Sequence, residues 1–258
     1  MIIDTHIHLD DSRYDNDLDD VIQRAYQGDV KRFIIPGADP NTLEKAIHIA
    51  HQYEDVYFGV GVHPYDKDAL KEYDLTHYIT DHKCVAVGEC GLDYFRLEGT
   101  PEQKEEEKKV QKEVFIQQIN LAKQYDKPLI VHIRDASHDA KEILLQHADE
   151  KLRGVLHCFN ADEQLLALAD HQFYFGIGGV VTFKNAKKLI QVLPKIPLER
   201  MIIETDGPYL TPTPHRGERN EPVYTNFVVE KIAQILEQDV EYIKQITTEN
   251  AMKLFNIN

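Results

Sequence analysis

The chain has 258 residues, of which 42% are hydrophobic and 28% charged, and its formal net charge is −15 at pH 7. This composition is typical of a globular enzyme with a substantial core, and the length fits one large domain or two small ones. The negative charge argues against tight nucleic-acid binding through an extended basic surface. It does not exclude an enzyme that meets phosphate through metal ions and a few local arginines.

The apolar segments of the sequence are all short. None approaches the ~20 residues that cross a bilayer. Met1 leads directly into a strand-like segment, without a charged region followed by an apolar leader. We therefore expect a cytoplasmic, monomeric protein with no membrane partner.

Short apolar segments alternate with amphipathic segments along the chain. The predicted strands are residues 2–9, 30–36, 56–64, 84–88, 128–132, 154–157, 173–177 and 201–204. The predicted helices are residues 17–27, 40–52, 68–80, 101–124, 136–147, 161–170, 185–193, 222–237 and 240–255. Asp39 and Pro40 are expected at the cap and first turn of the second helix.

This alternation predicts an α/β fold with a parallel sheet. At ~250 residues, eight strand–helix units most economically close into a single (β/α)₈ TIM barrel, whose active site lies at the C-terminal ends of the strands. No linker rich in Pro, Gly or Ser divides residues 1–258. The alternative is an open doubly wound sheet, but no Gly-x-Gly-x-x-Gly follows the first strand.

A His-x-His pair ends the first predicted strand. Residues two apart on a strand point the same way, so His6 and His8 should leave the backbone side by side. That arrangement suits two imidazoles that bind one cation. The alternative is that either histidine is a hydrogen-bonded core or surface residue.

Further polar residues follow other predicted strands, where a barrel would bring them to one rim. They are His63 at the end of the third strand, Glu89 after the fourth, His132 and His157 at the fifth and sixth, and Asp206 after the eighth. Taken alone, His63 suits a turn and Asp206 a helix cap. Imidazoles and carboxylates without clustered cysteines suit Zn²⁺, Mn²⁺ or Mg²⁺. The set exceeds what one catalytic ion needs, so we expect two divalent ions bridged by a carboxylate.

With these motifs the chain resembles the TatD-related metal-dependent hydrolases, known as deoxyribonucleases, within the amidohydrolase-like barrel group. The matching segments are residues 4–8, 88–94, 131–136, 157–159 and 204–210. After His157-Cys158-Phe159 the family usually has a small residue, often Gly, where this chain has Asn160-Ala161.

The resemblance implies a ligand set. One ion would be held by His6, His8 and Asp206, and a second by His132 and His157, with Glu89 bridging. Glu89 stands where many relatives in the wider group use a modified lysine. His63 resembles a family residue near the substrate phosphate.

Three residues form the predicted catalytic set, namely Asp206, Glu89 and His63. Asp206 is the candidate for orienting the attacking water and accepting its proton. Glu204, two residues earlier, is expected to orient a ligand.

Arginines and aromatic residues near these motifs are candidates for substrate binding. We expect Arg134, Arg216 and Arg219 beside phosphate, and the alternative for each is a surface salt bridge. Tyr94 and Phe95 are candidates for stacking on a base, or else they form part of the wall.

Three functions follow. The first is a two-metal phosphodiesterase acting on DNA, at ends or on single strands. The second is a hydrolase of an amide, a lactone or an aminoacyl ester such as D-aminoacyl-tRNA, which the acidic composition favours. The third is a non-catalytic metal-binding or partner-binding barrel, which would need a fully enclosed ion.

Overall fold

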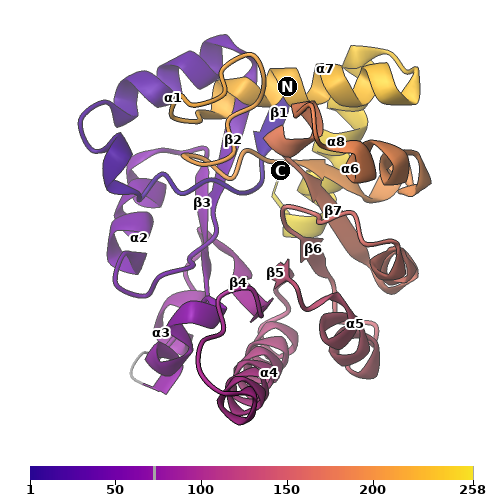
Figure 1. Cartoon of the computed structure of the whole chain (residues 1–258). Coiled ribbons are helices and arrows are strands. Elements are labelled where there is room, and N and C mark those ends of the chain that lie inside the picture. Colours follow the sequence, from indigo (N-terminus) through magenta and orange to yellow (C-terminus); the bar gives the residue numbers. More distant parts are fainter. Residues whose placement is uncertain (72–73, 258) are drawn as a thin grey trace.

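The computed structural model describes residues 1–71 and 74–257, and its eight parallel strands pair in the order β1 to β8. The strands are β1 Ile2–Asp4, β2 Val30–Ile35, β3 Val56–Val60, β4 Cys84–Asp93, β5 Leu129–Arg134, β6 Gly154–Leu156, β7 Phe173–Ile177 and β8 Met201–Ile203. Figure 1 shows these strands as a ring surrounded by helices.

Backbone contacts join the first and last strands through the residues that follow them. The Thr5 N–H donates to the Ile203 carbonyl at 3.1 Å, and the Asp206 N–H donates to the His6 carbonyl at 2.9 Å. Beyond these bonds, Ile7 forms an isolated parallel bridge with Gly207, and the His8 N–H donates to the Gly207 carbonyl at 2.8 Å. The sheet is therefore a nearly closed (β/α)₈ barrel. The predicted barrel is confirmed, and the open doubly wound alternative is wrong.

Helices connect the strands on the outside of the ring. They are α1 Leu18–Gln27, α2 Leu43–Gln52, α3 Thr76–Ile79, α4 Pro101–Gln124, α5 Ser137–Gln146, α6 Lys187–Val192, α7 Thr225–Leu236 and α8 Val240–Phe255. None of the described helices is long and apolar enough to span a membrane.

Some helix boundaries differ from the prediction. Helix α2 begins at Leu43 rather than Pro40, because Asp39 accepts the Asn41 N–H at 2.8 Å in a turn that precedes the helix. The predicted helix 161–170 is a 3₁₀ helix, Glu163–His171, which Asp162 caps.

The predicted helix 68–80 also differs from the structure. It contains the end of a 3₁₀ helix, Pro64–Lys71, and then the short α3, while residues 72–73 lie outside the described residues.

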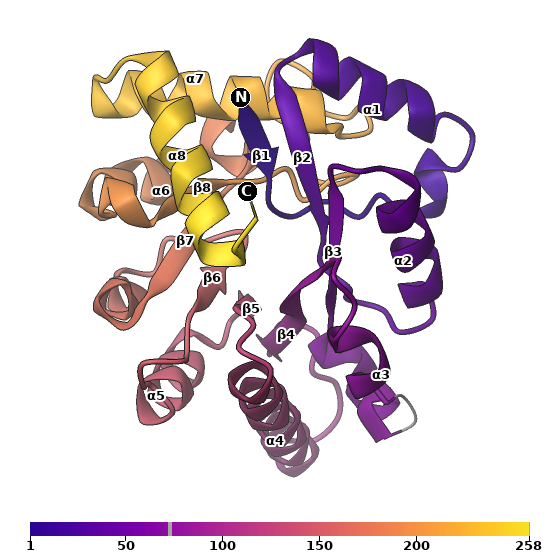
Figure 2. The ribbon, with the colours of Figure 1, turned by 180° about the vertical axis from the view of Figure 1, so that it is seen from behind.

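One cluster of buried and half-buried side chains contains a residue from every strand of the ring. It combines Ile3, Ile34, Tyr57, Ala86, Ile130, Val155, Tyr174 and Ile202 with Ala251, Leu254 and Phe255 of α8 and with Ile257. Figure 2 shows the end of α8 and the C-terminus lying across the ring on the side of the strand N-termini. These inward side chains fill the barrel below the site, and α8 covers that end.

Candidate metal centre

The inward positions of three strands supply site residues. Because side chains alternate along a strand, the residue two positions after an inward core residue also faces inward, one layer closer to the mouth. His132 follows Ile130 in this way, and the same step leads from Val155 to His157 and from Ile202 to Glu204.

Gly176 occupies the matching position after Tyr174 on β7. A Cβ atom there would lie 2.2 Å from Glu204 Oε2, so the absence of a side chain leaves room for that carboxylate. The position of the buried Glu204 carboxylate therefore requires glycine at residue 176.

His6 and His8 lie in the loop after β1, because that strand ends at Asp4. The prediction that they are strand residues is therefore wrong, but they are neighbours, with ring centres 5.1 Å apart. Buried Asp4 holds this loop by accepting the Thr205 N–H at 2.9 Å and the Thr205 hydroxyl at 2.7 Å. The loop after β1 is thus tied to the loop after β8.

Asp206 lies beside both histidines. Its Oδ1 is 3.7 Å from His6 Nε2 and 3.6 Å from His8 Nε2. One possible ligand atom from each residue lies within 4.8 Å of the other two. These three side chains thus offer three donor atoms to one ion.

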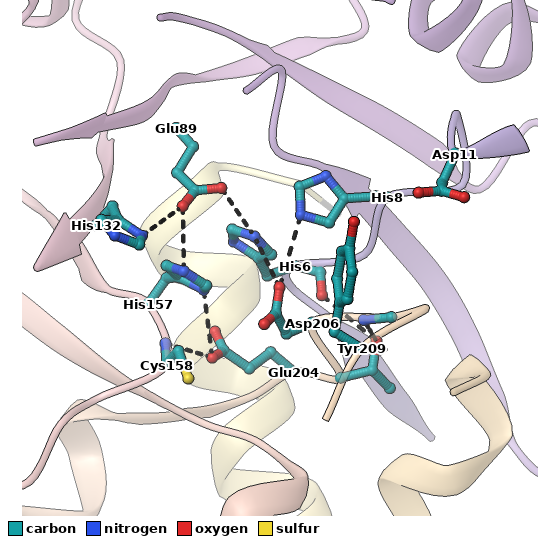
Figure 3. Close-up of polar contacts among 12 residues, drawn as sticks. His6, His8, Asp11, Glu89, His132, His157, Cys158, Glu204, Asp206 and Tyr209 are labelled. Atoms are coloured by element: carbon teal, nitrogen blue, oxygen red, sulfur yellow. Dashed lines mark hydrogen bonds and ion pairs between the residues drawn. The ribbon is translucent and has the colours of Figure 1, made fainter. Parts of the chain in front are cut away.

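Glu89 lies inside β4, which continues to Asp93, so the predicted end of this strand at residue 88 is wrong. Its two oxygens face different imidazoles. Oε2 lies 3.3 Å from His6 Nε2, whereas Oε1 lies 2.8 Å from His132 Nδ1 and 3.2 Å from His157 Nε2. Figure 3 shows Glu89 between the two groups. A carboxylate that bridges two ions requires this division.

The charges of the centre are strongly coupled. Burial raises the pKa of Glu89, but His157, His6 and His132 outweigh burial and hold that pKa well below its usual range. Burial disfavours charge on His157, yet Glu89 and Glu204 raise the pKa of this imidazole well above its usual value. A divalent cation bound among these nitrogen donors would neutralise the buried carboxylate of Glu89.

Two carboxylates outside the predicted ligand set orient the second group. Asp93 Oδ2 lies 2.9 Å from His132 Nε2, and Glu204 Oε1 lies 3.6 Å from His157 Nδ1. The opposite nitrogen of each imidazole faces Glu89 Oε1, and a carboxylate behind an imidazole in this way is common around bound metals. Glu204 was predicted in this role, whereas Asp93 was not.

Several buried polar atoms have no hydrogen-bond partner among the described residues. They include both ring nitrogens of His6, Nδ1 of His157 and Oε2 of Glu204. Such atoms cost free energy when they stay unsatisfied, and a bound cation is one explanation for them. The donor atoms present, imidazole nitrogen and carboxylate oxygen, fit two ions such as Zn²⁺ or Mn²⁺.

His63 adjoins the centre from the loop after β3. Its Nε2 is 3.7 Å from Glu89 Oε1, and its Nδ1 accepts the Tyr65 N–H at 3.2 Å. Burial lowers the pKa of His63 to about 4, so the imidazole is neutral near pH 7. Since Nδ1 accepts this hydrogen bond, the one proton of the neutral ring lies on Nε2, which faces the site as a donor.

A cavity of about 530 Å³ opens beside the second group of ligands. Its lining includes His132, His157 and Asp206, and Arg134 and Tyr209 also face it. Much of the remaining wall is apolar. The volume falls in the roughly 300–1,000 Å³ range of pockets that hold one small molecule.

Of the other predicted substrate contacts, Arg216 covers the Phe183 ring outside this cavity, and two more have internal partners. Arg219 Nη2 lies 2.7 Å from Asp17 and 2.8 Å from Glu221, which is the salt-bridge alternative. The Tyr94 hydroxyl donates to Asp139 Oδ2 at 2.8 Å, so this ring belongs to the wall beside α5. In the described chain, neither Arg219 nor Tyr94 lines the cavity.

The fold and the donor set together define a class of protein, a metal-dependent barrel hydrolase. A family model described as TatD related DNase matches residues 3–256, and the chain belongs to this family of metal-dependent hydrolases. The resemblance seen in the sequence motifs is thereby confirmed.

Relatives match along the whole chain. It is 43% identical to an uncharacterized metal-dependent hydrolase, YabD, of Bacillus subtilis, with 100% of both chains covered. It is 34% identical to the 3'-5' ssDNA/RNA exonuclease TatD of Escherichia fergusonii, again over 100% of both. The solved TatD homologue YJJV of Escherichia coli K12 superposes with a TM-score of 0.87 at 28% identity, covering 100% of this chain and 98% of that one.

Proposed function

We propose that this hydrolase cleaves phosphodiester bonds of DNA, at ends or in single strands, with two divalent ions. The observation that carries the proposal is the division of Glu89, whose two oxygens face separate imidazole groups beside a cavity that contains Arg134. The name of the Escherichia fergusonii relative, an exonuclease of single-stranded DNA and RNA, supports the same substrate class.

The residues divide into two sets around the ions. His6, His8 and Asp206 would hold the first ion, His132 and His157 would hold the second, and Glu89 would bridge them. When bound, two such ions lower the pKa of a water molecule and offset negative charge that grows on phosphoryl oxygens.

Asp206 is the proposed proton acceptor. Burial raises the pKa of this carboxyl, but His8, His157 and His6 outweigh burial and lower it below its usual value. The side chain is therefore ionised near neutral pH and lines the cavity, where it can orient a water and take its proton.

His63 and Arg134 are the proposed partners of the phosphate. Neutral His63 presents its Nε2 proton to the site, where it can donate to a phosphoryl oxygen or to the leaving oxygen. Arg134 lines the cavity two residues after His132 and can pair with a non-bridging oxygen. Both groups hold the substrate in line for attack.

Nucleotide release from an end-labelled 20-nucleotide DNA strand tests this proposal. In the presence of Mn²⁺ or Zn²⁺, His132→Ala should slow release roughly 1,000-fold, which corresponds to about 4 kcal/mol of transition-state stabilisation. His48→Ala is the matched control, because His48 is an exposed histidine on α2. Full activity of His132→Ala would exclude the proposed mechanism.

A hydrolase of another bond is the second candidate. The net charge of −15 disfavours a long polyanion, and the partly apolar cavity accepts a small ester or amide. A panel of phosphodiester, lactone, amide and aminoacyl ester substrates separates the two functions. If phosphodiesters are turned over far more slowly than the carbonyl substrates, hydrolysis of a carbonyl bond becomes the first candidate function.

A further inference from the structure

Arginine side chains at the mouth of the barrel stack on aromatic rings. The pairs, with the distance from guanidinium carbon to ring centre, are Arg96 over Tyr65 at 5.4 Å, Arg134 over Phe95 at 3.7 Å and Arg216 over Phe183 at 3.8 Å. All six residues lie at or after the C-terminal end of a strand, on the side of the metal centre. We call them the mouth pairs.

The arginines of the mouth pairs have no carboxylate partner among the described residues. By contrast, Arg24, Arg153 and Arg219 each approach a carboxylate oxygen within 2.8 Å. In a chain with a net charge of −15, cations that rest on rings rather than on acids are available to an external anion.

Exposed aromatic rings also gather at the mouth. Only five large hydrophobic side chains are exposed in the described chain, and three of them are Phe95, Tyr209 and Tyr65. Phe95 has the largest exposed fraction, 55%. Rings and guanidinium planes are the groups on which unpaired bases stack in nucleic-acid-binding proteins.

These aromatic residues adjoin the metal centre from two sides. The Tyr65 ring centre is 4.8 Å from that of His63, and the Tyr209 ring centre is 6.2 Å from that of His8. Arg13 covers Tyr209 at 4.3 Å, but Asp11 holds this arginine at 2.8 Å, so Tyr209 offers a ring without a free cation. A strand that follows these rings reaches the proposed catalytic residues.

We propose that the mouth pairs form a track for an unpaired nucleic-acid strand, with bases stacked on the rings and phosphates paired with the arginines. This proposal rests on the proposed phosphodiesterase function. It adds that the protein recognises its substrate by the exposed faces of unpaired bases. In a duplex the base faces are stacked on one another, and the negative charge of the protein repels the many phosphates of a long duplex. Single strands are therefore preferred over duplexes.

Fluorescence anisotropy of the metal-loaded protein tests the track. The probes are a labelled 12-nucleotide thymidine strand with phosphorothioate linkages, a matched strand without bases and a duplex. Phe95→Ala should weaken binding of the thymidine strand about 10-fold, because stacking on one ring is lost. Binding of the strand without bases should change little. Arg96→Ala should weaken both strands and reduce the salt slope of log K by about 0.7.

Arg200→Ala is the matched control. Arg200 also covers a ring, that of Tyr174 at 5.1 Å, but this ring is only 3% exposed and lies toward the opposite end of the barrel. This variant should bind all probes as the wild type does.

The possible outcomes separate the track from the enzymatic function. Equal binding of the two single strands by the wild type, or a duplex bound as tightly, overturns the track. Equal effects of Phe95→Ala on both strands overturn it as well. A base preference that Phe95→Ala removes, without hydrolysis of an unmodified strand by any metal form, supports the track and excludes phosphodiester cleavage.

Discussion

Asp93→Asn should weaken binding of the second metal ion. Asp93 is fully buried and faces His132 Nε2 at 2.9 Å, while the opposite nitrogen faces Glu89. Loss of a carboxylate behind a metal-binding imidazole typically lowers metal affinity about 10–100-fold, or about 1.4–2.7 kcal/mol. Since Asn keeps an oxygen that can accept the same hydrogen bond, we expect a value near 10-fold.

Titration of metal-free protein with Mn²⁺, followed by calorimetry, resolves the effect. In Asp93→Asn, affinity of one ion should fall while that of the ion held by His6, His8 and Asp206 stays the same. Asp139→Asn is the control, since Asp139 pairs with Lys112 at 2.6 Å and with Tyr94, outside the proposed ligand set. Unchanged binding of both ions, or equal weakening of both, would refute the role of Asp93.

Four further results are expected. A divalent ion at 100 times its Kd should raise the unfolding free energy by about 2.7 kcal/mol, which calorimetry should record as a rise in Tm of roughly 5–11 °C; no rise would contradict the buried site. Gly176→Ala should lower stability to urea by about 1–3 kcal/mol, because the new Cβ meets Glu204 Oε2 at 2.2 Å. Arg219→Ala should lower stability by about 1 kcal/mol and leave single-strand affinity unchanged, whereas Arg134→Ala should weaken it; the reverse result would restore the original interpretation of Arg219. Arg219 lowers the pKa of Asp17. Burial raises the pKa of Glu221, but Arg24 and Arg219 outweigh burial and lower it. Both acids therefore bind fewer protons in the folded state than in the unfolded state, and their stabilisation is lost as the pH falls below about 4.5. Urea unfolding at decreasing pH should therefore show a steeper loss for the wild type than for Arg219→Ala.

The sequence was sufficient for the barrel because each strand is a compact apolar segment and each candidate ligand stands at or near a strand end. The sequence was insufficient where a strand continues beyond a glycine. The run Gly88-Glu89-Cys90-Gly91 suggested the end of a strand, yet β4 continues to Asp93. Alternation along the longer strand would have placed Asp93 on the same face as Glu89.

Contacts between distant residues account for the other differences. The role of Arg219 depends on Asp17, which is 202 residues earlier and carries no marker of that partnership. Tyr94 is held by Asp139, 45 residues later. In both cases the residue type suited a substrate contact, and only the packing of helices against the barrel showed an internal partner.

The meeting of β1 with β8 has a consequence for when the centre can form. His6 and His8 leave the ribosome early, whereas Asp206 and the backbone that holds Asp4 arrive only after the last strand has been made. An incomplete nascent chain therefore lacks the proposed first ion site, although it already contains His132 and Glu89. Any hydrolysis that needs both proposed ions would therefore begin only after synthesis of the barrel is finished.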